Sequence, residues 1–227
     1  MSTSRASPQR QPARSPFDLP AFLDTALAAL QLGFNPEQRR QVLAFVGLLL
    51  RWNRVYNLTA VRDPAAIATL HLADCLAAVV PIARVRPRRL LDVGSGGGLP
   101  GLIVAIALPD AEVHLVDTVQ KKCAFLQQAA ATLGLRNVVV HHSRVQDLDR
   151  GMAFDCITSR ALGSLADLVA ASSDLLAPEG VWCAMKGQAP AAEIAELPAG
   201  YDVTTQPLVV PGLDAERCLV WIRRPAQ

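Results

Sequence analysis

Residues 90–101 read Leu90-Leu91-Asp92-Val93-Gly94-Ser95-Gly96-Gly97-Gly98-Leu99-Pro100-Gly101, and this stretch decides the fold. An apolar run ends in a loop of small residues, and a helical pattern follows from Leu102 to Leu108. Strand, glycine loop and helix is the arrangement by which an α/β protein forms a nucleotide or cofactor cradle at the carboxyl end of a strand. Glycines permit positive φ angles and a close approach of a ligand to the backbone. We therefore expect a nucleotide-like cofactor at this loop.

Two kinds of cofactor compete for the loop. A dinucleotide fingerprint, G-x-G-x-x-G, fits only from Gly96 to Gly101, two residues late after the strand. The alternative pattern, Asp-x-Gly-x-Gly-x-Gly, begins at Asp92 and places an acid beside the loop. That acid would repel a pyrophosphate, whereas it suits the positive amino-acid end of S-adenosylmethionine. A tight turn that binds no ligand is the remaining alternative.

A second acid strengthens the cofactor interpretation. Residues 113–117 read as a buried strand that ends in Asp117, 23 residues after Gly94. This is about the spacing at which an acid reaches the ribose hydroxyls of a bound adenosine. Asp117 could also cap the helix that follows, and the two roles are compatible.

Composition limits the class of protein. A chain of 227 residues with 51% hydrophobic residues fits one domain with an ample core. We expect no window that reaches the length of a membrane span, and the N-terminus has no apolar segment typical of a secretion signal. The five cysteines form no C-x-x-C pair. That pattern predicts reduced, buried thiols in a cytoplasmic protein, with no metal site and no disulfides.

The basic residues are unevenly distributed. Residues 33–89 carry nine arginines and three acids, a net charge of +6, whereas residues 90–227 have a net charge of −5. Such asymmetry suggests a polyanionic partner, although a single arginine is more simply read as part of a solvated helix face. For the dense group at residues 84–89, the favoured interpretation is phosphate contact. The candidate residues for binding a polyanion's phosphates are Arg51, Arg54, Arg62, Arg84, Arg86, Arg88 and Arg89.

The chain divides into three parts. Residues 1–16 read as a disordered basic tail, residues 17–82 as a helical lead-in, and residues 83–227 as a Rossmann-like core that forms one compact unit with the helices. Within the lead-in, we expect a helix at 19–32 that stops at Gly33. A second begins at Asn35-Pro36, and a third runs from Asp63-Pro64 to about Val80, before Pro81.

From Arg89 onward, strand and helix patterns alternate. Strands are expected at 89–94, 112–117, 137–141, 154–159, 181–186, 202–210 and 217–223, and helices at 100–108, 119–132, 164–176 and 190–196. Alternation of this kind predicts a parallel sheet covered on both faces. The predicted fold is α/β: a mostly parallel seven-stranded sheet with a terminal antiparallel hairpin, the layout of a class I methyltransferase.

The remaining site residues are expected at the carboxyl ends of the other strands. Residues 143–147 follow the third strand and could hold an adenine. Arg160 and Lys186 end two neighbouring strands, where each is either a catalytic group or a rim charge paired with an acid. None of the four histidines is placed as a general base, so the acceptor atom needs no deprotonation. Guanine N7 is such an atom, because its lone pair attacks a methyl group directly.

Several motifs in order resemble the RsmG (glucose-inhibited division protein B) family. The matching segments are Trp52-Asn53-x-x-x-Asn57-Leu58-Thr59, His71-x-x-Asp74, residues 92–101, Ser159-Arg160-Ala161, Lys186-Gly187-Gln188 and Leu213-Asp214-x-Glu216-Arg217. The similarity covers roughly residues 20–224, all but the tail. It implies a bacterial methyltransferase that uses S-adenosylmethionine to methylate guanine N7 at nucleotide 527, in the 530 loop of 16S ribosomal RNA.

The resemblance implies cofactor contacts at Gly94, Leu99, the backbone around Val145 and Gln146, and Arg160. The residue pattern adds Asp92, Ser95, Gly96, Gly98 and Asp117 as cofactor contacts, and Arg160 and Lys186 as the catalytic residues. The chain departs from the family at Gln146, where Glu is common, at Cys75, where Ser is common, and at Leu99, where Phe is frequent. The implied partner is 16S ribosomal RNA, as the small ribosomal subunit or an assembly intermediate, and the expected state is a monomer in the cytoplasm. Rival functions are a small-molecule methyltransferase, a nicotinamide oxidoreductase and a non-catalytic RNA-binding protein on the same fold.

Overall fold

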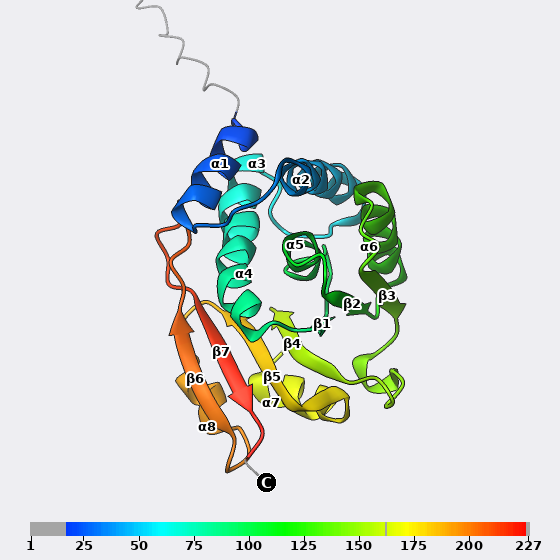
Figure 1. Ribbon diagram of the computed structural model, residues 1–227, viewed down its shortest axis with the longest axis vertical. Coiled ribbons are helices and arrows are strands. Elements are labelled where there is room, and N and C mark those ends of the chain that lie inside the picture. Colours follow the sequence, from blue (N-terminus) through cyan, green and yellow to red (C-terminus); the bar gives the residue numbers. More distant parts are fainter. Residues whose placement is uncertain (1–16, 162, 226–227) are drawn as a thin grey trace, which may run out of the picture.

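A computed structural model describes residues 17–161 and 163–225. The predicted basic tail at 1–16 lies outside the described residues. Seven strands form one sheet in the order β3-β2-β1-β4-β5-β7-β6 (Figure 1). The strands are β1 (Arg89–Val93), β2 (Glu112–Asp117), β3 (Val138–His142), β4 (Phe154–Arg160), β5 (Leu176–Lys186), β6 (Asp202–Pro207) and β7 (Cys218–Arg223).

The direction of each strand follows the predicted layout. Strands β1 to β5 pair in parallel, whereas β7 is antiparallel to both β5 and β6. The α/β class and the terminal antiparallel hairpin are therefore confirmed. Strand β5 begins at Leu176, five residues before the predicted start, because Leu176 already pairs with Phe154 ahead of a register shift in β4.

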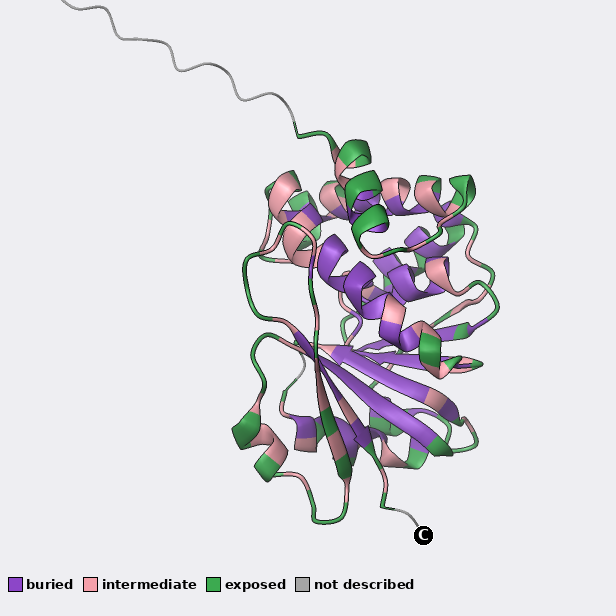
Figure 2. Ribbon diagram, turned by 60° about the vertical axis from the view of Figure 1, so that its left-hand side comes forward, coloured by how far each residue is buried: buried purple, intermediate pink, exposed green. Residues whose placement is uncertain are grey.

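Helices cover both faces of the sheet (Figure 2). Alternate strand residues point to opposite faces, so Leu90 joins one hydrophobic cluster and Leu91 the other. The first face carries α4 (Asp74–Val85), α5 (Gly101–Ala107) and α6 (Gln120–Leu133), beneath α1 (Leu19–Ala29) and α2 (Pro36–Tyr56). The second face carries α7 (Leu165–Ser172), and the short α8 (Ala191–Ala195) lies beside α7.

Helix α2 begins as predicted. The Asn35 side chain accepts a hydrogen bond from the Gln38 amide at 2.9 Å, and the Gln38 side chain accepts one from the Asn35 amide at 2.9 Å. This reciprocal capping box satisfies two of the free N–H groups at the start of the helix. The Gln38 side chain also donates to the carbonyl of Ile106 at 2.8 Å, so the cap fastens α2 to α5.

The first helix ends earlier than predicted. It stops at Ala29, and Gln31, not Gly33, takes the left-handed conformation with φ of 54°. The Leu32 amide then bonds back to the Leu27 carbonyl at 2.9 Å, and Leu32 packs against the core. The helix thus ends where Leu32 can pack against the core. The left-handed position therefore falls on Gln31, although glycine favours that conformation more.

The predicted helix end before Pro81 is wrong. The helical stretch comprises α3 (Pro64–Ile67), a π turn η1 (Ala68–Ala73) and α4, which continues through Pro81 to Val85. Pro81 and Ile82 are buried in this element, and their packing offsets the one backbone hydrogen bond that proline cannot donate.

The same stretch corrects a second expectation. The helix at Pro64–Val85 is long and apolar enough to cross a membrane by length and composition, contrary to the expectation that no window would be. However, 67% of its apolar window is buried inside the protein, where α4 packs between the sheet and α1. A buried core helix meets the same criteria of length and composition, and the burial of this helix identifies it as one.

Candidate functional site: the carboxyl edge of the parallel strands

The glycine loop after β1 is built from left-handed positions. Gly94, Gly96 and Gly98 have φ angles of 71°, 54° and 81°. A Cβ at Gly98 would lie 2.4 Å from the Leu102 side chain, so this position also excludes larger residues by contact. The amides of Gly94 and Ser95 both donate to the Val116 carbonyl, at 2.9 and 3.1 Å. These bonds fix the loop against the end of β2.

Asp92 lies beneath the loop. It is fully buried, and its Oδ2 atom accepts a hydrogen bond from the Gly101 amide, at the start of α5, at 3.1 Å. Its Oδ1 atom has no hydrogen-bond partner among the described residues. Burial raises the pKa of Asp92 to about 7. The loop therefore covers a carboxyl group that is poised to lose its proton when a positive group approaches.

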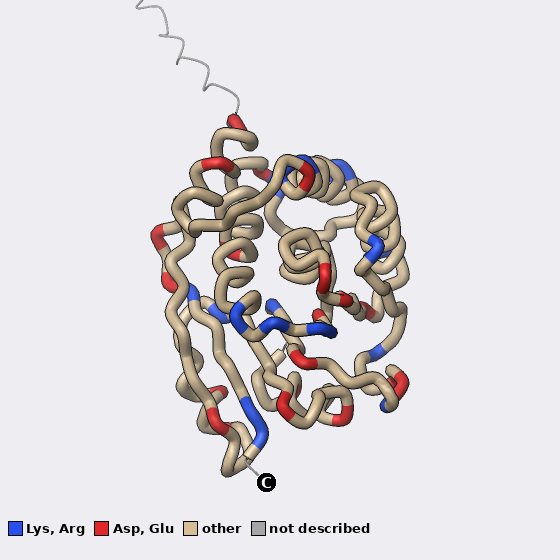
Figure 3. Tube along the Cα trace, in the orientation of Figure 1, with Lys and Arg blue, Asp and Glu red and all other residues tan. Residues whose placement is uncertain are grey.

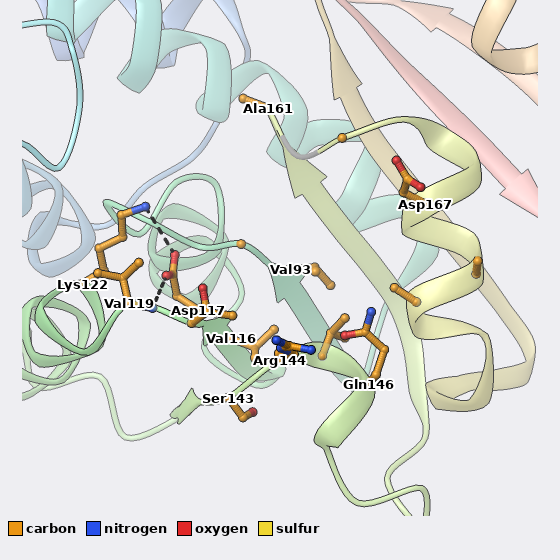
Figure 4. A pocket seen from close by; sticks show the side chains of 16 residues that line it. Val93, Val116, Asp117, Val119, Lys122, Ser143, Arg144, Gln146, Ala161 and Asp167 are labelled. Carbon is orange, nitrogen blue, oxygen red and sulfur yellow. Dashed lines mark hydrogen bonds and ion pairs between the residues drawn. The ribbon is translucent and has the colours of Figure 1, made fainter.

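Asp117, at the end of β2, joins the loop to α6. Its Oδ2 accepts from the Gly96 amide at 2.9 Å, and its Oδ1 accepts from the Val119 amide at 2.8 Å. The Lys122 ammonium lies 3.9 Å from the same carboxylate (Figure 4). The predicted role of Asp117 as the helix N-cap is wrong: α6 begins at Gln120, its N-cap residue is Val119, and Asp117 accepts from the amide of that residue instead of capping the first turn. The carboxylate is held at the rim of a pocket.

The pocket itself has a volume of about 660 Å³ and opens at the carboxyl ends of β1 to β4 (Figure 4). This size falls within the range of roughly 300–1,000 Å³ typical of small-molecule sites. Its walls come from four strand ends and from α7. The lining residues are Val93, Gly94, Val116, Asp117, Thr118, Val119, Lys122, Ser143, Arg144, Val145, Gln146, Ala161, Gly163, Asp167, Ala170 and Ala171.

The structure divides the predicted cofactor residues into two groups. Gly94, Asp117, Val145 and Gln146 line the pocket directly. The others form the loop and its support behind that wall: Asp92, Ser95, Gly96, Gly98 and Leu99. Leu99 is 5% exposed and belongs to the hydrophobic core.

Arg160 and Lys186 lie at the ends of adjacent strands, as predicted. Arg160 pairs in register with Met185, the residue before Lys186. Each cation also meets an acid. Arg160 Nη1 lies 3.8 Å from Asp74 and hydrogen-bonds to His71 at 3.0 Å, whereas Lys186 Nζ lies 2.7 Å from Glu193. Neither side chain lines the pocket, although Ala161, directly after Arg160, does.

The seven candidate RNA-binding arginines fall into two groups. The first group comprises Arg51 and Arg54, on the last turns of α2, and Arg62, in the loop that follows. Leu49 of α2 and Leu58 of that loop would touch a Cβ placed at Gly97, so the segment that carries the first group packs against the glycine loop. Figure 3 shows the second group, residues 84, 86, 88 and 89, where the chain leaves α4 and enters β1 at the amino edge.

The members of the second group differ in their partners. Arg89 lies 3.6 Å from Glu112 and stacks over the Phe154 ring at 5.2 Å, so its charge is partly used inside the protein. Arg84, Arg86 and Arg88 are exposed and form no ion pair with another described residue.

Sequence reasoning missed two charged residues of the pocket, Lys122 and Asp167. Lys122 lies in the first turn of α6, five residues after Asp117. This short spacing from a predicted site residue could have indicated that Lys122 also lies at the pocket. Asp167 gave no such signal, because its side chain also closes the capping box of α7 with Ser164.

Three comparisons with known proteins agree with this geometry. The family model described as "rRNA small subunit methyltransferase G" (GidB) matches residues 38–220. A Methylibium petroleiphilum protein named ribosomal RNA small subunit methyltransferase G is 50% identical over 217 residues, which cover 92% of this chain and 98% of that protein.

Solved structures share the fold at low sequence identity. The ribosomal protein L11 methylase of Lactobacillus delbrueckii subsp. bulgaricus superposes with a TM-score of 0.53 and 19% identity, over 66% of this chain and 78% of that one. The glycopeptide N-methyltransferase MtfA, solved with S-adenosyl-L-homocysteine, gives a TM-score of 0.53 at 15% identity, over 66% and 89%. All of these relatives are methyltransferases by name.

Proposed function

Since the chain belongs to the rRNA small subunit methyltransferase G family, we propose that it uses S-adenosylmethionine to methylate guanine N7 at nucleotide 527, in the 530 loop of 16S ribosomal RNA. The observation that carries the proposal is the pocket at the carboxyl edge, where the glycine loop, Asp117 and Gln146 meet. We further propose that the protein acts as a cytoplasmic monomer on the small subunit or an assembly intermediate.

The residues present fit this cofactor. Asp117 is held at the rim of the pocket, where it can accept hydrogen bonds from ribose hydroxyls. Val145 and Gln146 offer backbone and amide groups to an adenine. The unpartnered Oδ1 atom of Asp92 lies beneath the loop and supplies negative charge for an amino group. S-adenosylmethionine, when bound, supplies an electrophilic methyl group on a positively charged sulfur.

The remaining chemistry consists of positioning. Guanine N7 carries a lone pair and no proton, so no side chain has to act as a base before transfer. The protein must hold the base in line with the methyl group, and such alignment alone lowers the barrier. Arg160 and Lys186, at the ends of β4 and β5, are proposed to contact guanine O6 or a neighbouring phosphate. The first arginine group, whose segment packs against the glycine loop, is proposed to hold phosphates of unpaired RNA.

The test is methyl transfer from labelled S-adenosylmethionine to small ribosomal subunits that lack this modification, with the modified base mapped by mass spectrometry. We expect label on guanine N7 in the 530 loop. Calorimetry with S-adenosylmethionine and with NAD is the parallel measurement. Cofactor binding without transfer to any form of the subunit would favour a non-catalytic RNA-binding protein, and binding of NAD instead would favour an oxidoreductase.

A further inference from the structure

A polar cluster beside the pocket joins Arg160 to side chains that have no role in the methyl transfer proposed above. Its members come from segments far apart in the chain: Thr59 after α2, His71 in the π turn, Asp74 at the start of α4, Arg160 at the end of β4, and Arg217 before β7. Asp74 is 4% exposed, and the side chains of Arg160 and Arg217 are 20% and 23% exposed. The cluster is therefore largely withdrawn from water, where hydrogen bonds orient side chains strongly.

Three contacts bear on the protonation state of His71. Nε2 lies 2.6 Å from the Thr59 hydroxyl, whereas Nδ1 lies 3.0 Å from Nη1 of Arg160 and 3.0 Å from the Leu70 carbonyl. The carbonyl would accept a proton from Nδ1, whereas a guanidinium can only donate; because a hydrogen bond from a charged donor is the stronger of the two, the contact with Arg160 favours a lone pair on Nδ1. The proton of a neutral imidazole then lies on Nε2, which donates to Thr59. His71 is thus an acceptor for Arg160 only while it is neutral.

The surrounding charges favour this neutral form. Burial and the charge of Arg160 both lower the pKa of His71. The hydrogen bond with the Leu70 carbonyl opposes them as a smaller effect on that pKa. The Asp74 carboxylate lies 3.8 Å from Arg160 and 3.4 Å from Arg217. The other titratable groups that feel the Arg160 charge are Asp92 and Cys75.

Among the described residues, His71 is the one hydrogen-bond partner of the Arg160 guanidinium. Asp74 attracts it at a longer distance, and Asp74 Oδ1 has no hydrogen bond of its own. A charge at that separation restrains a side chain without orienting it, because an ion pair has little directional preference compared with a hydrogen bond. The direction of the guanidinium is therefore decided by His71.

The backbone is irregular on both sides of this contact. His71 lies in the π turn that interrupts the long helix, and turns of this kind occur frequently at functional sites. Ala161, next to Arg160, has a φ of 57°, which a residue with a Cβ rarely adopts. Ala161 also forms part of the pocket wall, so the placement of Arg160 is tied to the shape of the cofactor site.

We propose that His71 is a positioning residue for methyl transfer: its neutral Nδ1 atom fixes the Arg160 guanidinium at the end of β4, beside the pocket wall formed by Ala161. The proposal rests on the function proposed above for this site. Protonation of His71 turns Nδ1 into a donor that faces another donor, so Arg160 leaves its position. Methyl transfer then declines on the acidic side through loss of alignment.

The kinetic test compares two variants. His71→Leu removes the acceptor, and we expect kcat on small subunits to fall roughly ten- to a hundredfold, the amount expected for a hydrogen bond to a charged group. His71→Asn keeps an acceptor oxygen near the position of Nδ1 and does not titrate. It should restore most of kcat and flatten the acidic decline between about pH 8 and about pH 5.5, the range in which histidine titrates. Asp74 and Asp92 remain in both proteins, so their titration cancels in the comparison.

A second test does not depend on activity. Nitrogen NMR of His71 in the cofactor-free protein should show the Nε2–H tautomer and a pKa below the ordinary histidine value. The pKa should rise in Arg160→Gln, whereas Arg40→Gln, an exposed control on α2, should leave it unchanged. An Nδ1–H tautomer, or a titration that ignores Arg160, would overturn the proposal. If the wild-type protein methylates no ribosomal RNA, the proposed function fails, and the NMR result still decides the role of His71.

Discussion

At the scale of single residues, Asp92 shows how the site stores a charge for a ligand. The carboxyl group is fully buried and one of its oxygens has no partner among the described residues, so its negative form is costly in the cofactor-free protein. Folding therefore raises its pKa to about 7. A positive group bound nearby would stabilise the ionised carboxylate and offset this cost. Asp92 therefore lowers the stability of the ligand-free protein but increases its affinity for a positively charged ligand.

This arrangement predicts opposite effects of Asp92→Asn on stability and on binding. The folded protein holds a proton on Asp92 that the unfolded chain, with an ordinary pKa, has already lost. Stability from this group is therefore present at low pH and lost as the pH rises through about 7. Relative to the Asn variant, the wild type should lose about 1–2 kcal/mol of unfolding free energy between about pH 6 and about pH 9.

The measurement is urea unfolding of both proteins at the two pH values, together with calorimetry of S-adenosylmethionine binding. The Asn variant should bind the cofactor more weakly, and its affinity should depend less on pH. A stability difference that is the same at both pH values would show that Asp92 does not titrate in this range.

The pairing of Lys186 with Glu193 makes a second prediction at this scale. Lys186 Nζ lies 2.7 Å from Glu193, so Lys186→Ala removes both an ion pair and the proposed contact with RNA. Glu193→Ala removes the ion pair and the hydrogen bond that Glu193 accepts from the Leu165 amide at 2.9 Å, but it leaves the Lys186 ammonium in place. We expect Lys186→Ala to lower turnover on ribosomal RNA with cofactor affinity near wild type, while Glu193→Ala keeps most of the turnover. Equal losses in the two variants would assign Lys186 to the ion pair only, and Lys121→Ala serves as the surface control.

At the scale of elements, the end of the strand at which a basic group lies decides what it can reach. The segment that carries the first arginine group, residues 51, 54 and 62, packs against the glycine loop, whereas Arg84, Arg86 and Arg88 precede β1 at the amino edge. Strand β1 has five residues, which at about 3.3 Å each separates the edges by about 16 Å. An RNA that touches both groups must therefore extend past the sheet.

Salt dependence separates the two groups. Neutralising the first group with three Arg→Gln changes should reduce the dependence of log affinity on log salt by about 0.7–0.9 per lost phosphate contact, both on a short RNA that carries the 530 loop and on the small subunit. Neutralising Arg84, Arg86 and Arg88 should reduce the slope on the small subunit alone. The two triple variants carry the same charge change, so each is the control for the other. An unchanged slope on the short RNA would assign the first group to a solvated surface, and an unchanged slope on the small subunit would do the same for the second group.

At the scale of the whole molecule, the helical lead-in and the sheet share one core. Leu23 of α1, Phe45 of α2, Val113 of β2 and Leu219 of β7 belong to a single hydrophobic cluster. Polar contacts reinforce it, since the Gln41 side chain donates to the Leu133 carbonyl of α6 at 2.9 Å. Burial of this kind couples the stability of the lead-in to that of the sheet.

We therefore expect Phe45→Ala to destabilise the whole protein. Phe45 is fully buried, and its removal should cost about 3–5 kcal/mol in one cooperative transition. Val55→Ala on the same helix is the control, because Val55 is 69% exposed and should change stability by less than about 0.5 kcal/mol. The measurement is thermal unfolding followed by circular dichroism and by tryptophan fluorescence. Two separate transitions in the Phe45 variant would show that the helices and the sheet fold independently.

The order of the elements and the end of the sheet where the pocket lies can be predicted from the amino-acid sequence. Strand positions were predicted within a few residues, because period-two and buried apolar patterns are local properties of the chain. The glycine loop was recognised for the same reason, since positive φ angles at Gly94, Gly96 and Gly98 depend on residue type. Asp117 and Gln146 could be placed at the pocket because parallel strands share a carboxyl edge.

Which side chains meet depends on the packing of distant segments and could not be predicted from the sequence. The helix through Pro81, the stop at Gln31 and the early start of β5 all follow from burial or pairing with segments distant in the chain. The contact of His71 with Arg160 joins residues 89 positions apart, and the separation of the two arginine groups depends on the direction of β1. The local pattern of apolar and polar residues determines on which face of a strand or helix a side chain lies. The partner of a charged side chain depends on how elements distant in the chain pack together, and no local pattern contains that information.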